Sequence, residues 1–247
     1  MQKQLSSAPH PRYAEQRPGR SLIPVKVLIF GATGMIGRGV LLECLRDPDV
    51  DLVVILGRTA TGILDGKLRE IIHRDFADYS AMEESLSGFD ACFYCLGISS
   101  AGMSEADYTR VTFTYTMAAA EPLSRFNPAM KFIFVSGVGT DSTEKGRTMW
   151  ARVKGRTENA LLKLPFDAFM FRPGFIEPLD GIESRTPLYR KIYAVSRPLF
   201  PMLRRIFPNH VLTTRQIGRA MLNVGRQGYP RHILEPRDIR IAAGPGA

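Results

Sequence analysis

Apolar and polar positions along this chain follow two patterns that take turns. Short apolar runs rich in β-branched residues predict strands at 25–30, 51–56, 68–73, 90–96, 131–136 and 166–172. Apolar residues at helical spacing predict helices at 35–46, 79–86, 104–125, 148–163, 187–206 and 214–225. A short last strand is expected near 232–234. Because strands and helices alternate, we predict an α/β protein with a doubly wound parallel sheet.

The first strand and helix are joined by a glycine-rich turn that predicts the class of ligand. Its sequence, Gly31-Ala32-Thr33-Gly34-Met35-Ile36-Gly37, directly follows the apolar run 25–30. Gly31 allows a sharp turn, Gly34 lets the backbone approach a pyrophosphate, and Gly37 lets the helix pack on the sheet. The free N–H groups and the positive dipole end of the helix favour phosphate. The turn therefore predicts a Rossmann-like dinucleotide site with contacts from Gly31, Thr33, Gly34, Met35, Ile36 and Gly37.

The residue after the second strand bears on which dinucleotide is bound. Arg58 stands twenty-one residues after Gly37, where NAD sites commonly place an acid that holds the ribose hydroxyls. A carboxylate would repel a 2′-phosphate, whereas a guanidinium can bind one bidentately, so the sequence favours NADP. The alternative is a solvated arginine at a strand end. After the third strand, Asp75 and Phe76 are placed to meet the adenine, or else form an ordinary turn.

The composition fits one domain with a basic carboxyl-terminal region. At 247 residues and 45% hydrophobic, the chain can bury the core of a single NAD(P)-binding domain at 25–247. Residues 1–24 hold four prolines and few large apolar groups, and we expect a flexible arm there. From Ser184 to Leu234 there are ten Lys and Arg and no Asp or Glu, which accounts for the formal net charge of +9. We expect 184–234 to form a small basic lobe, a substrate lid, over the carboxyl edge of the sheet.

Within this lobe, residues 187–207 mix aromatic, aliphatic and cationic side chains, and three interpretations stay open. The segment is a lid whose arginines favour an anionic ligand, a peripheral surface for anionic lipid, or a packed lobe with a solvated basic face. Because no recognisable motif accompanies the charge, we do not expect nucleic-acid binding. No apolar run is long enough to cross a membrane.

Three cysteines, Cys44, Cys92 and Cys95, favour a reducing compartment, and we expect a cytoplasmic protein. Cys92 and Cys95 have Cys-x-x-Cys spacing but fall in a predicted buried strand. Since positions three apart on a strand point to opposite faces, these thiols cannot easily share a metal or a disulfide. We therefore predict buried structural cysteines and no metal site.

Further motifs match a known superfamily. They are Leu56-Gly57-Arg58, Tyr94-Cys95-Leu96-Gly97, Phe134-Val135-Ser136, Val153-Lys154-Gly155-Arg156-Thr157-Glu158 and Phe171-Arg172-Pro173-Gly174. With the glycine turn, and over about residues 25–235, the chain resembles the atypical members of the short-chain dehydrogenase/reductase superfamily. Among these, it is most similar to the Tat-interacting, oxidoreductase-like proteins and their bacterial relatives.

The resemblance implies catalytic roles for two residues and one departure from the usual pattern. Ser136 matches the serine that orients the substrate carbonyl or alcohol. Lys154 matches the lysine that holds the nicotinamide ribose and lowers the pKa of a tyrosine four residues before it. That position is Trp150, whose indole donates a hydrogen bond but does not titrate usefully. A displaced acid remains open among Tyr94, Tyr108, Tyr115, Tyr189 and Tyr193.

The resemblance also implies cofactor contacts from two later strand ends. After the fourth strand these are Cys95, Leu96 and Gly97, where the missing side chain of Gly97 would let the ribose or pyrophosphate approach. After the sixth strand, Pro173, Gly174, Phe175 and Ile176 would lie at the nicotinamide end. A plain strand exit is the alternative there, since Pro-Gly marks one in any case.

These features predict an NADP-binding, short-chain-dehydrogenase-like oxidoreductase that acts on an unknown small molecule. The alternative, which Trp150 favours, is a non-catalytic NADP(H)-binding sensor or scaffold. The resemblance also implies a homodimer formed through the long helices at about 104–125 and 148–163.

Overall fold

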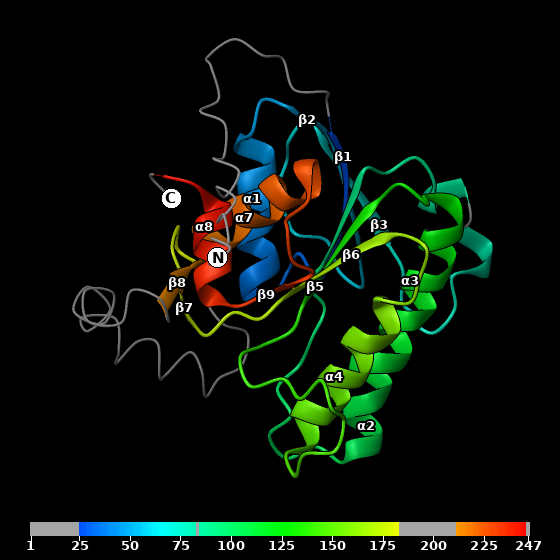
Figure 1. Cartoon of the computed structure of the whole chain (residues 1–247). Helices are drawn as coiled ribbons and strands as arrows, with labels where there is room; N and C mark the ends of the chain where they lie inside the picture. Colours follow the sequence, from blue (N-terminus) through cyan, green and yellow to red (C-terminus); the bar gives the residue numbers. More distant parts are fainter. Residues whose placement is uncertain (1–24, 83, 183–210, 246–247) are drawn as a thin grey trace, which may run out of the picture.

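The computed structural model describes residues 25–82, 84–182 and 211–245. A seven-stranded parallel sheet runs through its middle in the order β3-β2-β1-β4-β5-β6-β9 (Figure 1). Its strands are β1 (Val25–Phe30), β2 (Val50–Gly57), β3 (Leu68–Ile72), β4 (Ala91–Tyr94), β5 (Lys131–Val135), β6 (Asp167–Phe171) and β9 (Ile233–Leu234). Chain order runs outward in both directions from β1 and β4, so the predicted doubly wound, Rossmann-like sheet is confirmed.

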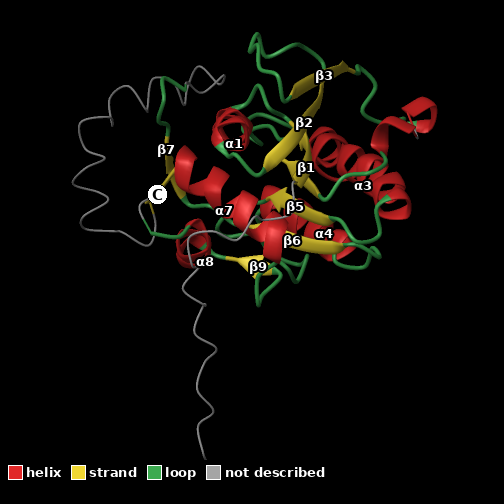
Figure 2. Cartoon of the chain, turned by 90° about the horizontal axis from the view of Figure 1, so that it is seen from above, coloured by secondary structure: helices red, strands yellow, loops and turns green. Residues whose placement is uncertain are grey.

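Helices cover both faces of the sheet (Figure 2). One face carries α1 (Met35–Arg46), α7 (Thr214–Gln227) and α8 (Pro236–Ala243). The other carries α2 (Glu105–Thr109), a π-helical segment η3 (Arg110–Thr114), α3 (Tyr115–Phe126) and α4 (Met149–Leu161). No helix in the described part of the chain is both long enough and apolar enough to span a bilayer.

Alternate residues of β1 point to opposite faces of the sheet, and both faces are covered by apolar core. Val27 and Ile29 enter the core cluster under α1 and α7, while Leu28 and Phe30 enter the cluster on the opposite face. All four side chains are fully buried. A strand buried on both faces has no polar alternation, as expected for a central parallel strand.

The predicted helix at 79–86 is wrong. The segment forms two 3-10 turns, η1 (Ser80–Met82) and η2 (Glu84–Leu86). Tyr79 and Leu86 are buried and produce the helical spacing, but most of the described positions between them are exposed. These positions add little apolar contact, and packing contact is what stabilises a short helix in water.

Several elements differ from the predictions or add to them. The helix predicted at 104–125 is interrupted by η3, and β7 (Phe175–Glu177) pairs in parallel with β8 (Val211–Thr213) in a separate two-stranded sheet. Helix α8 was not predicted either. The expected arm at 1–24, the expected helix at 187–206 and much of the expected basic lobe lie outside the described residues.

A close contact between α1 and α7 holds α1 in place on one face of the sheet. A Cβ atom on Gly39 would lie 2.7 Å from Cβ of Thr214, and one on Gly218 would lie 2.8 Å from Cγ of Glu43. Two glycines that face the opposite helix allow the helix backbones to approach closely. This packing holds α1, and therefore the turn before it, firmly against the sheet.

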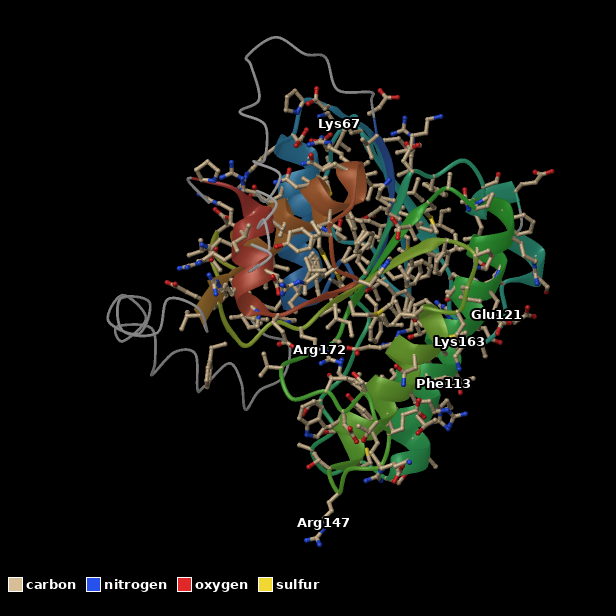
Figure 3. The ribbon with its side chains drawn as sticks, in the orientation of Figure 1. Lys67, Phe113, Glu121, Arg147, Lys163 and Arg172 are labelled. Carbon is tan, nitrogen blue, oxygen red and sulfur yellow. The ribbon has the colours of Figure 1, made fainter. Side chains whose placement is uncertain are left out.

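A buried ion pair holds α4 in place on the other face. Arg172, directly after β6, donates from Nε to Oε1 of Glu158 on α4 (3.0 Å) and from Nη2 to Oε2 of the same carboxylate. Glu158 is fully buried, and Arg172 is 9% exposed. The guanidinium also donates to Ser142 (2.6 Å) and to Glu235 (3.3 Å). Figure 3 shows Arg172 between the end of the sheet and α4, so one side chain joins four segments.

We predict that Glu158→Gln lowers the free energy of unfolding by about 3 kcal/mol, because it leaves a buried guanidinium without its carboxylate. The matched control is Glu105→Gln, which breaks the more exposed Arg152–Glu105 pair and should cost less than about 1 kcal/mol. Urea denaturation of the two variants and the native protein measures both effects. Equal losses in the two variants would contradict the prediction.

Candidate cofactor and active site

The glycine turn is compressed between β4 and the start of α1. Gly31 has a φ of +74°, and a Cβ atom there would lie 2.7 Å from the backbone of Cys95 and Leu96. A Cβ atom on Gly37 would lie 2.2 Å from the carbonyl oxygen of Gly31. Neither position can take a side chain without backbone movement. Gly34 differs, since a Cβ atom there would meet one atom, the Gly31 oxygen at 3.3 Å.

The start of α1 has polar backbone groups to offer to a ligand. Its N-cap is Gly34, which has no side-chain cap, and the first turn holds no acidic residue. Arg38 is the first residue whose N–H reaches the N-cap carbonyl, that of Gly34 (2.8 Å). The N–H groups of Met35, Ile36 and Gly37 precede it and have no acceptor within the helix. The helix start therefore suits an anion.

Two arginines lie near the loop that follows β2. Arg58 is exposed, and its Cζ atom lies 5.9 Å from the ring centre of Phe76. Arg38, in the first turn of α1, donates to the carbonyl oxygen of Thr61 (3.2 Å) in the same loop. Sequence reasoning missed Arg38, although a basic residue directly after the glycine motif was a usable signal.

Asp75 and Phe76 each have a structural role. The Asp75 carboxylate accepts from the N–H of Ala77 (2.9 Å), which makes a local turn. The Phe76 ring is buried and packs edge-on against Tyr115. Contact with an adenine stays a prediction for both residues.

Ser136 follows β5 directly and is 7% exposed. Its Oγ atom lies 2.9 Å from Oγ1 of Thr140, which donates its own proton to the carbonyl of Gly137 (2.7 Å). Since the Thr140 proton is used, Ser136 must be the donor in the first bond. The lone pairs of Ser136 thus remain available as acceptors. Thr140 was not predicted, because its role depends on how the loop folds back.

Lys154 lies beside Ser136. Its Nζ atom donates to the carbonyl oxygen of Val135 (3.2 Å), the residue that precedes Ser136, and lies 5.3 Å from the ring centre of Phe134. Burial lowers the pKa of Lys154 to about 8, and the buried carboxylate of Glu158 only partly opposes this effect. The ammonium group therefore titrates near pH 8.

Trp150 lies on the same side of α4, one turn before Lys154. A Cβ atom on Gly139 would lie 3.5 Å from the Trp150 ring. The indole is thus packed against the loop that carries Ser136 and Thr140, and it is partly buried.

The tyrosines considered as displaced acids differ in position. Tyr94 is fully buried in the core and stacks on Phe132, and burial raises its pKa. Tyr108 is also buried, with a raised pKa. Tyr115 is partly buried against Phe76. Tyr189 and Tyr193 lie outside the described residues.

The two cysteines of the Cys-x-x-Cys pair lie on opposite faces of the sheet, as predicted. Cys92 belongs to the core cluster on one face, and Cys95 packs against the cluster on the other. Both are free, and burial raises the pKa of each thiol. They serve packing.

The remaining predicted contacts line the ends of β4 and β6. A Cβ atom on Gly97 would meet nothing within 4 Å, so the space above it is open. The carbonyl of Pro173 accepts from the N–H of Val138 (3.1 Å), which joins the loops after β5 and β6. Phe175 is 73% exposed, whereas Ile176 is buried. A ligand contact from Ile176 would have to come from its backbone.

Comparisons with known proteins agree with this geometry. Residues 27–148 match the model of the NAD dependent epimerase/dehydratase family. The chain is similar to a UDP-N-acetylglucosamine 4-epimerase from Methanobrevibacter ruminantium, solved with UDP-N-acetylmuramic acid. The identity is 15% and the TM-score 0.63, over 84% of this chain and 75% of that chain.

Two further structures are similar. The Bordetella bronchiseptica enzyme WbmF, solved with NAD+, matches at 13% identity and a TM-score of 0.62, over 90% of this chain and 78% of that one. An oxidoreductase of the short-chain dehydrogenase/reductase family from Burkholderia thailandensis matches at 16% identity and a TM-score of 0.61. The match covers 89% of this chain and 93% of that chain. At such identities the structures show a shared fold.

With the family match over residues 27–148, these findings support an NAD(P)-binding Rossmann fold like that of the short-chain dehydrogenase/reductase superfamily. They support a nicotinamide dinucleotide cofactor and an oxidoreductase-like function.

We predict different outcomes for two glycine variants. Gly37→Ala should destabilise the protein by about 3 kcal/mol, because the methyl group overlaps the Gly31 carbonyl. Gly34→Ala should cost less than about 1 kcal/mol but weaken NADPH binding at least tenfold, because its methyl group would enter the space where the phosphate is expected.

Gly66→Ala is the control, since a Cβ atom there meets nothing within 4 Å. It should change neither stability nor binding. Urea denaturation and titration of NADPH fluorescence measure the two properties. The assignment fails if Gly34→Ala binds NADPH as tightly as the native protein does.

Proposed function

We propose that this protein is an NADP(H)-dependent oxidoreductase that interconverts a small carbonyl compound and its alcohol. The observation that carries the proposal is the compressed glycine turn, with uncapped N–H groups of α1 beyond it and Lys154 and Ser136 at the same edge of the sheet. Ligands of doubly wound sheets bind at this edge, beside the point where the strand order reverses.

The residues present fit a dinucleotide. Gly31 and Gly37 bring the turn so close to β4 and α1 that side chains are excluded, and Gly34 leaves room beside the helix start. The N–H groups of Met35, Ile36 and Gly37 would hold the pyrophosphate. The open space at Gly97 would accept the ribose next to Cys95 and Leu96. Phe175, with Pro173 and Gly174, would face the nicotinamide.

Charge near β2 supports NADP over NAD. Arg58 is exposed at the strand end, and Arg38 reaches the same loop from α1. Two guanidinium groups suit a 2′-phosphate, which an acid at position 58 would repel. Asp75 and Phe76 would flank the adenine.

The site residues can handle the proton of the reaction. When bound, the cofactor supplies or accepts the hydride. In the reducing direction, the substrate carbon gains the hydride and the substrate oxygen gains a proton. Lys154, with a pKa lowered to about 8, can give that proton at neutral pH and take one back in the reverse direction. Ser136, whose proton goes to Thr140, can accept from the hydroxyl group of the alcohol.

Trp150 favours a second candidate, a protein that binds NADP(H) without turnover and acts as a sensor or scaffold. An indole cannot replace a phenol in proton transfer. The two candidates differ in one measurable respect. Turnover of NADPH by the native protein with any aldehyde, ketone or quinone contradicts the sensor. Turnover that appears only in Trp150→Tyr contradicts the enzyme.

The first test of the proposal is cofactor preference. We expect NADPH to bind more tightly than NADH, and Arg58→Ala to weaken NADPH binding about tenfold or more while leaving NADH binding unchanged, because a charge-assisted hydrogen bond is lost. Arg147→Ala is the control, since Figure 3 shows Arg147 pointing away from the protein at its far tip. Fluorescence titrations with both cofactors measure this, and tighter binding of NADH would contradict the NADP assignment.

The second test is the pH profile. The rate of carbonyl reduction should fall as pH rises through about 8, because the Lys154 ammonium group loses the proton that it donates. The oxidation rate should rise over the same range. Lys154→Arg should remove the inflection, since a guanidinium does not titrate there. Lys163→Arg changes an exposed lysine just after the carboxyl end of α4 (Figure 3) and should leave the inflection in place.

A measurement without turnover accompanies this profile. Competitive acetylation of the native protein at a series of pH values, read by mass spectrometry, gives the pKa of each lysine. Lys154 should titrate near 8. A value near 10 would remove Lys154 from the proton transfer.

A further inference from the structure

Three neighbouring strands lead into exposed apolar side chains at the same edge of the sheet. Ile98 follows β4 and is 41% exposed, Val138 follows β5 and is 44% exposed, and Phe175 follows β6 and is 73% exposed. β4 pairs with β5, and β5 pairs with β6, all in parallel. The three residues therefore come from adjacent loops at the carboxyl ends of the strands.

These loops are held in place. The N–H of Val138 donates to the carbonyl of Pro173 (3.1 Å), which joins the loops that carry Val138 and Phe175. The Trp150 ring packs beside Gly139, the residue after Val138. We call Ile98, Val138, Trp150 and Phe175 the apolar rim. It adjoins Ser136 and Lys154, where the reacting oxygen would lie.

Two charged side chains near the apolar rim, those of Arg172 and Asp141, are engaged with other groups. Arg172 is buried against Glu158. The Asp141 carboxylate accepts from Thr143 and Gly146 within its own loop. Among the described residues of the loops after β4 and β5, no charged side chain occurs at 95–104 or 136–140. Segments 95–104 and 136–140 therefore add no cation for a diphosphate beside Lys154, and Arg38 and Arg58 lie by the loop after β2.

From this arrangement we infer that the substrate is an uncharged carbonyl compound with an apolar chain, and not a nucleotide-sugar. Its hydrocarbon part packs on the apolar rim, and its carbonyl oxygen accepts from Lys154, next to the segment that carries Ser136. This inference rests on the proposed function. The carbonyl carbon gains a hydride from NADPH, the oxygen gains a proton from Lys154, and the products are an alcohol and NADP+.

The test measures binding of a series of 2-alkanones, from 2-butanone to 2-decanone, by equilibrium dialysis with NADP+ present. Because NADP+ cannot reduce a ketone, binding is seen without turnover. Each methylene that packs on the rim should tighten binding about fourfold, from about 0.8 kcal/mol per buried methylene. UDP-glucose should not bind. Trp150 is the only tryptophan, so its fluorescence should change with the bound alkanone.

Two variants locate the site. Phe175→Ser should weaken 2-decanone binding about tenfold and flatten the dependence on chain length. Leu162→Ser is the matched control, because Leu162 is also an exposed apolar residue, 38% exposed, at the opposite end of α4. It should leave binding unchanged. Thermal melts show whether both variants are folded.

Affinity that does not depend on chain length, or UDP-glucose binding as tight as that of 2-decanone, would overturn the inference. An effect of Leu162→Ser equal to that of Phe175→Ser would do the same. NADPH binding is measured separately. If NADPH does not bind, the proposed function fails, and titration of the free protein with 2-alkanones still tests the apolar rim.

Discussion

The candidate cofactor site at the carboxyl edge of the sheet depends on one constraint, the close approach of the glycine turn to the end of β4. Backbone atoms of Cys95 and Leu96 occupy the space that a side chain at position 31 would need. The Gly31 carbonyl in turn occupies the space that a side chain at position 37 would need. Three segments therefore meet at backbone distance where the strand order reverses. Only such a meeting leaves the N–H groups of α1 at the edge of the sheet, uncovered by side chains.

A second constraint, the buried Arg172 side chain, positions the part of the carboxyl edge beside β5 and β6. Arg172 binds Glu158, Ser142 and Glu235, so α4, the loop after β5, the end of β6 and the start of α8 share one guanidinium. Because α4 carries Trp150 and Lys154, the Arg172 side chain also fixes the position of these two residues relative to the sheet. The glycine turn and Arg172 thus position the two halves of the candidate site independently, one by backbone contact and the other by buried charge.

The sequence predicts elements formed by contiguous residues well. It predicts poorly the contacts that form only when a loop turns back or when distant segments pair. The strands and α1 follow from apolar runs and from the glycine turn, which are contiguous in the chain. The pairing of β7 with β8 joins segments on either side of residues 183–210, and three-residue strands carry too little pattern to reveal it. Thr140 reaches Ser136 only because the loop turns back, and the apolar rim becomes visible only when exposure is known. For the site residues, the structure gives positions, and ligand contact stays a prediction.

Trp150 and Lys154 are best understood together. An indole at position 150 removes a titratable group and adds apolar surface beside Ser136. The lysine one turn later is partly buried, and burial lowers its pKa to about 8. For a lysine, that direction means that folding disfavours the ammonium form, so below this pH the buried charge costs free energy, and the cost disappears as pH rises. A residue with only a structural role could be replaced there by an apolar one without this cost. Perturbed groups of this kind gather at functional sites, and an apolar substrate would exclude water from just this amine. Under the proposed function, the loss of the phenol and the lowered pKa of the lysine are two parts of one arrangement, in which Lys154 would replace a phenol at position 150 as the proton donor.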